Sequence, residues 1–158
     1  MVFLENYFQL ILMLHLLTTF FLIGSMTHNL LRVVDYARGR FNRRKQEQRF
    51  NSAMFWSYII VYVQGCLIYP AFRVYMRRDY FDISLGWATG LFEVKEHWGA
   101  LALAMIAFYY ILRKSFDPGE EKDRCKLFLY VSLCFLINFI IWYKTIIGAY
   151  LSHLKGAF

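Results

Sequence analysis

Four long apolar segments separated by polar loops constrain this chain more than any other feature. A helix needs roughly 20 apolar residues to cross about 30 Å of hydrocarbon. Segments near this length occupy residues 7–31, 52–76, 88–112 and 127–152 of the 158-residue sequence. The chain is 59% hydrophobic, and such a share with such long runs is typical of integral membrane proteins. We therefore predict an all-α integral membrane protein, a four-helix bundle in the lipid bilayer that forms a single domain over residues 1–158.

The third segment is the least regular, because its uninterrupted apolar part is short. The run from Trp98 to Leu112 covers only about 15 residues, fewer than a span needs. The helix must begin upstream, and it then carries four ionisable residues into the membrane: Glu93, Lys95, Glu96 and His97. A charge at membrane depth costs at least about 2.5–3.5 kcal/mol, so such residues usually face an interior and mark function. The alternative is an amphipathic lead-in that lies at the membrane surface.

Charged residues between the segments predict the orientation of the chain. The loop after the first segment contains Arg32, Arg38, Arg40, Arg43, Arg44, Lys45 and Arg49. Its only acids are Asp35 and Glu47. The loop after the third segment adds Arg113, Lys114, Lys122, Arg124 and Lys126. The positive-inside rule places both loops in the cytoplasm, so we expect the inner (cytoplasmic) membrane, with both termini on the outer, periplasmic side. This topology also accounts for the net charge of +7, and we expect no nucleic-acid partner.

Two histidines are predicted to lie at the same depth in the membrane. His15 precedes the basic residue Arg32 by 17 positions. His97 precedes Arg113 by 16 positions. At a rise of about 1.5 Å per residue, both imidazoles stand roughly 24–26 Å from the inner boundary, in the outer half of the bilayer. Two imidazoles at one level on different helices can ligate one haem iron, so we predict a single haem b held by His15 and His97. The alternative is a pair of hydrogen-bonded interior histidines.

Other residues near this depth suit a haem site. Gly65 would let a flat macrocycle approach the backbone of the second segment closely. Lys144 and Arg73 lie at or just outside this level and could pair with the haem propionates. Glu93 is four residues before His97 on one helical face, so it could orient the imidazole or transfer protons. Two alternatives stay open: the charged residues could form a buried ion network, and Lys144 could extend to the outer surface.

A resemblance to a known family rests on a few of these residues. The pair Leu14-His15, a Gly24 nine residues later, and Lys95 in a later segment resemble the HemJ-type membrane protoporphyrinogen oxidases. The resemblance implies a helical bundle that binds b-type haem and oxidises protoporphyrinogen IX, with His15 and Lys95 as its functional residues. It covers mainly the first and third segments. The chain lacks the family's basic or tryptophan residues around the first histidine, and it adds Glu93, Glu96 and His97.

Three functional hypotheses follow from the sequence. The first is a membrane protein like a b-type cytochrome, which transfers electrons or performs redox chemistry on a hydrophobic substrate such as a quinone or porphyrinogen. In this hypothesis Lys95 and Glu93 are the candidate catalytic residues of an oxidoreductase. The second is a haem-free accessory subunit of a larger membrane complex. The third is a proton or ion pathway through Glu93, Lys95 and Glu96. With so few residues outside the apolar segments, all three predict other membrane or redox protein subunits as partners.

Overall fold

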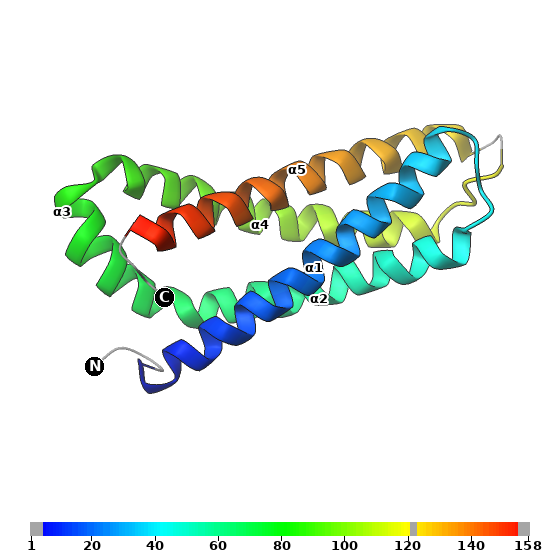
Figure 1. Cartoon of the computed structure of the whole chain (residues 1–158). Helices are drawn as coiled ribbons and strands as arrows, with labels where there is room; N and C mark the ends of the chain where they lie inside the picture. The colour runs from blue at the N-terminus through cyan, green and yellow to red at the C-terminus, as the bar shows by residue number, and fades with distance from the viewer. Residues whose placement is uncertain (1–4, 121–122, 155–158) are drawn as a thin grey trace.

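The computed structural model describes residues 5–120 and 123–154, and this part of the chain is helical with no β-strand (Figure 1). Four long helices make up most of it: α1 (Phe8–Ala37), α2 (Arg44–Phe72), α4 (Gly86–Lys114) and α5 (Arg124–Leu154). Three short elements complete it: the 3₁₀ turn η1 (Glu5–Tyr7), the π-helical η2 (Arg73–Phe81) and α3 (Asp82–Ser84). The predicted all-α class is confirmed.

Three of the helical stretches are long and apolar enough to cross a membrane. They are α1, the continuous stretch Arg44–Ser84, and α5. The chain is therefore suited to a lipid bilayer as a multi-pass membrane protein. The helix α4 is not among these three stretches, and its first half carries the charged residues Glu93, Lys95 and Glu96.

The long helices have two ends that differ in their connections (Figure 1). At one end, here called the loop end, lie the α1–α2 and α4–α5 connections. At the other, here called the terminal end, lie η2, α3, the start of α1 and the end of α5. The α1–α2 connection turns at Gly39, whose φ of 73° is a conformation that glycine adopts readily. The proline Pro70 lies in the last turn of α2 and donates no backbone N–H, and the wider π-helical η2 follows directly.

Each long helix packs against two others. The helix α1 contacts α2 and α5, while α4 contacts α5 and α2, so the order around the structure is α1, α2, α4, α5. The segment η2 packs against α2 and α4 at the terminal end. Residues from all four long helices can therefore meet in the interior.

Two clusters of hydrophobic residues lie in the interior. Along α2, α4 and α5, a few consecutive residues between them belong to neither cluster, and we call this interval the gap. On α2, the larger cluster extends to Tyr62 and the smaller begins at Tyr69. On α4, the smaller cluster ends at Phe92 and the larger begins at Trp98. On α5, the gap separates residues 141 and 147. The helix α1 contributes its first buried residue only at position 22, so its N-terminal half is not buried. The interval contains the polar residues Gln64, Lys95 and Lys144 together with the buried Ile68.

Candidate functional site

The gap between the two clusters contains His15, on the exposed half of α1. The imidazole is half-buried and lies against α2: its Cε1 atom is 3.7 Å from the position that a Cβ on Gly65 would take. One turn along α1, the hydroxyl of Thr18 donates a hydrogen bond of 2.6 Å to the side chain of Gln64, which holds the two helices together there. The ring atom Nδ1 of His15 is buried and has no hydrogen-bond partner in the described part of the chain, although the imidazole also interacts with the backbone of Val61 through a hydrogen bond. A buried polar nitrogen without a partner is costly, so this atom is open to a ligand.

Two lysines from the other pair of helices lie near the same imidazole. Lys95 on α4 and Lys144 on α5 both act electrostatically on His15, and also on each other. The structure thus brings together His15, Gly65, Lys95 and Lys144, one residue from each of the four long helices. We call this group the terminal-end site.

His97 lies apart from the terminal-end site, on the exposed side of α4. Its Nδ1 is 2.7 Å from the backbone oxygen of Glu93, one turn earlier. Lys95 and the buried Gly99 are each two positions from His97, and two positions on an α-helix are rotated by about 200°. His97 therefore points away from the face that carries Lys95, and no contact joins it to His15 among the described residues.

The remaining predicted site residues are also outside the terminal-end site. The carboxylate of Glu93 accepts a hydrogen bond of 2.6 Å from Arg77 on η2, so it binds the turn segment rather than an imidazole. Only the backbone oxygen of Glu93 meets His97. Arg73 is exposed at the start of η2. Glu96 is exposed as well, and one of its oxygens is 3.6 Å from Lys95 Nζ. Within the charged run of α4, Lys95 therefore points into the structure, whereas Glu93, Glu96 and His97 are exposed.

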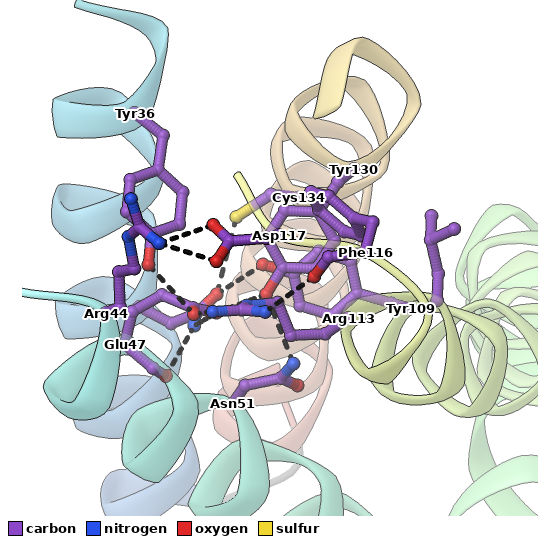
Figure 2. A network of polar contacts seen from close by, with 12 residues as sticks. Tyr36, Arg44, Glu47, Asn51, Tyr109, Arg113, Phe116, Asp117, Tyr130 and Cys134 are labelled. Atoms are coloured by element: carbon purple, nitrogen blue, oxygen red, sulfur yellow. Dashed lines mark hydrogen bonds and ion pairs between the residues drawn. The ribbon is translucent and has the colours of Figure 1, made fainter. Parts of the chain in front are cut away.

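A second polar assembly, at the loop end, was missed by the sequence analysis. Its centre is Glu47, which is fully buried, and Figure 2 shows the contacts that converge on it. The nearest partner is Arg113, whose Nε is 2.6 Å from a Glu47 oxygen. The hydroxyls of Tyr130 and Tyr36 donate to the same carboxylate, Tyr36 at 3.2 Å. Sequence analysis counted Glu47 and Arg113 only as charges of cytoplasmic loops, whereas both are buried.

Further hydrogen bonds extend the loop-end assembly to all four long helices. Tyr109 donates to Asn29 at 2.7 Å, and Asn29 in turn lies 3.4 Å from Glu47. The rings of Tyr109 and Tyr130 stack with centroids 4.1 Å apart. Closer to the surface, Arg44 and Asp117 form an ion pair of 2.5 Å that ties the start of α2 to the α4–α5 connection. Each of these charged groups has an opposite charge beside it, so the assembly joins the four long helices through paired charges. The asparagine Asn29, a polar residue in an apolar segment, was the sequence signal for it.

The described residues contain no cluster of three or more His, Cys, Asp or Glu side chains that could hold a metal ion. A metal held at His15 would therefore need most of its ligands from another source.

Comparison with known proteins gives no match: no family model, no curated protein and no solved structure matches this chain. The likeness to HemJ-type oxidases therefore rests on the short sequence motifs alone.

Proposed function

We propose that this chain is a multi-pass protein of the inner membrane that binds one b-type haem at the terminal-end site. Its role is electron transfer, or redox chemistry on a hydrophobic substrate such as a quinone or porphyrinogen. The observation that carries the proposal is the buried, unpartnered Nδ1 of His15, in a site to which all four long helices contribute.

The residues present fit a haem with one protein ligand. His15 would hold the group through its imidazole, and Gly65 keeps the neighbouring stretch of α2 free of a side chain beside the ring. The bound group would supply the redox chemistry, while the protein would hold it away from water between apolar helices. His97 does not fit as a second ligand in this arrangement, because it lies on the opposite face of α4 from Lys95. The proposal therefore keeps His15 and omits His97 from the iron.

The family resemblance adds support, because the two residues that it singles out are neighbours in space. His15 and Lys95 are far apart in the sequence and interact electrostatically in the terminal-end site. A lysine beside the bound group could act on a substrate that gains or loses protons along with electrons.

The topology in this proposal has four spans, with both termini outside. The helix α4 packs along α5, which is apolar and long enough to span, and α4 is almost as long. A helix in that position crosses the bilayer beside its neighbour. The terminal-end site then lies in the outer half, where sequence depth places His15.

An absorption spectrum of the protein extracted from membranes tests the proposal. We expect a Soret band in the wild type and its loss in His15→Ala, because His15 supplies the imidazole of the site. The matched controls are His97→Ala and His28→Ala, both changes at exposed histidines, which should keep the band. A colourless wild-type protein after supply of haem would refute haem binding. If it then co-purifies with fixed partners, the accessory-subunit hypothesis takes its place.

A further inference from the structure

Lys95 and Lys144 cross the interface between α4 and α5 in a matched arrangement. A Cβ on Gly99 would lie 2.5 Å from Nζ of Lys144. A Cβ on Gly148 would lie 3.3 Å from Cε and 3.7 Å from Nζ of Lys95. Each lysine side chain therefore lies over a glycine of the opposite helix. A larger residue at either glycine would crowd that lysine.

The two lysine–glycine pairs follow the antiparallel register of α4 and α5. Gly99 is four positions after Lys95, and Gly148 is four positions after Lys144. This spacing is one helical turn, about 6 Å. The two ammonium groups consequently lie about one turn apart, on the same interface and near His15.

The charges of this pair are not balanced by the described residues around it. One carboxylate, that of Glu96, is 3.6 Å from Lys95 and acts electrostatically on Lys144, but 42% of its side chain is exposed. The Glu93 carboxylate is engaged by Arg77. The other neighbours are aromatic faces: Lys144 lies 5.8 Å from the ring centre of Tyr58, and Lys95 lies 5.5 Å from that of Phe92.

The hydroxyl of Tyr58 does not serve as a further partner for Lys144, because it donates to the backbone oxygen of Gly99 at 2.8 Å. Aromatic faces attract cations more weakly than a carboxylate does in a low-dielectric site. Two ammonium groups with one exposed carboxylate leave a net positive charge at membrane depth, where charge is expensive. An anionic ligand would remove this imbalance.

We infer that Lys95 and Lys144 form a binding site for the carboxylate end of a membrane-borne amphiphile. Its apolar body would lie in the gap between the two hydrophobic clusters, beside His15 and Gly65. This chemistry is shared by a porphyrin with propionate arms and by a long-chain fatty acid. With a porphyrin as the ligand, the inference rests on the proposed function and assigns the propionate partners to Lys95 and Lys144 in place of Arg73.

Esterification of the ligand tests the inference, since an ester keeps the apolar body and removes the negative charge. Purified full-length protein is titrated with haem and haem dimethyl ester by absorption, and with oleate and methyl oleate by calorimetry. We expect the wild type to bind an acid at least about tenfold more tightly than its ester, as for charge-assisted hydrogen bonds. The double variant Lys95→Gln/Lys144→Gln should lose this preference and keep the affinity for the ester, which also reports an intact fold. The variant Lys45→Gln, which removes an exposed positive charge at the loop end, is the control and should keep the preference.

Each remaining outcome decides one of the two proposals. Equal binding of acid and ester by the wild type overturns the carboxylate site and leaves haem binding intact. A preference that survives in the double variant overturns it too. If neither porphyrin binds but oleate is preferred over methyl oleate, the carboxylate site stands and the haem proposal fails. If no acid is preferred and no porphyrin binds, both fail.

Discussion

The loop end and the terminal end both gather polar side chains from the four long helices, but they differ in how these groups are partnered. At the loop end, Glu47 is fully buried and receives Arg113 and two tyrosine hydroxyls. At the terminal end, two ammonium groups have one exposed carboxylate between them, and Nδ1 of His15 has no partner. The difference lies in the charged groups. Glu47 and Arg113 pair with each other inside the protein, although the amide oxygen of Asn51 beside them has no partner among the described residues. Lys95 and Lys144 share one exposed carboxylate, and charged groups that lack a counter-charge are the more costly case. The comparison therefore assigns stability to the loop end and binding to the terminal end.

The largest expected effect is at the centre of the loop-end assembly. Replacing Glu47 by Ala leaves the buried guanidinium of Arg113 without its counter-charge, which costs about 3–5 kcal/mol of unfolding free energy. Thermal or denaturant unfolding in detergent measures the loss. The double variant Glu47→Leu/Arg113→Leu, which removes both charges, should recover most of it. A single variant as stable as the wild type would contradict the structural role of this pair.

A smaller effect is expected when the hydroxyl of Tyr130 is removed from the same assembly, together with its hydrogen bonds to Glu47 and from Asn51. Tyr130→Phe keeps the ring that stacks on Tyr109 and deletes the hydroxyl that donates to Glu47. The expected loss is about 1.5–3 kcal/mol, the range for hydrogen bonds to charged groups. The same unfolding assay measures it, and ligand binding at the terminal-end site should be unchanged. If this variant lost ligand binding but kept its unfolding free energy, the assignment of stability to the loop end and of binding to the terminal end would be wrong.

The opposite pattern is predicted for His15. His15→Leu removes a buried nitrogen that has no partner, so the unfolding free energy of the ligand-free protein should change by less than about 1 kcal/mol. The Soret band should nevertheless disappear. Unfolding measured without haem, together with the spectrum after its addition, separates the two effects. A destabilisation comparable with that of Glu47→Ala would show that His15 is a structural residue.

The smallest effect concerns two glycines of α4. Gly90→Ala meets nothing within 4 Å and should stabilise the helix by about 0.5–1 kcal/mol, the cost of glycine relative to alanine. Gly99→Ala should lack this gain, because its Cβ would lie 2.5 Å from Nζ of Lys144 and displace the lysine. The two melting temperatures are compared in one buffer. Equal stabilisation by both substitutions would mean that Lys144 does not need the space over Gly99.

Depth in the membrane was the most useful quantity that the sequence could provide. Because the rise per residue of a helix is constant, counting from the basic loops grouped His15, Gly65 and Lys144, and the structure brings these three together. Rotation about the helix axis could not be counted in the same way, since nearly every position in these segments is apolar and the period is blurred. For that reason His97 was grouped with His15, although the structure places it on the exposed side of α4, away from Lys95.

The loop end was hidden from the sequence for a different reason. Counting charges in a loop treats each one as solvated, so Glu47 was only a minor acid among many basic residues. Its burial depends on Arg113 and Tyr130, which are distant in sequence and come together only when α2, α4 and α5 pack. The all-helical class followed from apolar length alone, while the partners of each polar group required the tertiary structure.

The absorption spectrum of three proteins extracted side by side tests the central claim most directly: the wild type, His15→Leu and Tyr130→Phe. The account predicts a Soret band in the wild type and in Tyr130→Phe, and none in His15→Leu. A wild type that stays colourless with haem supplied, or a band of equal strength in His15→Leu, would contradict it.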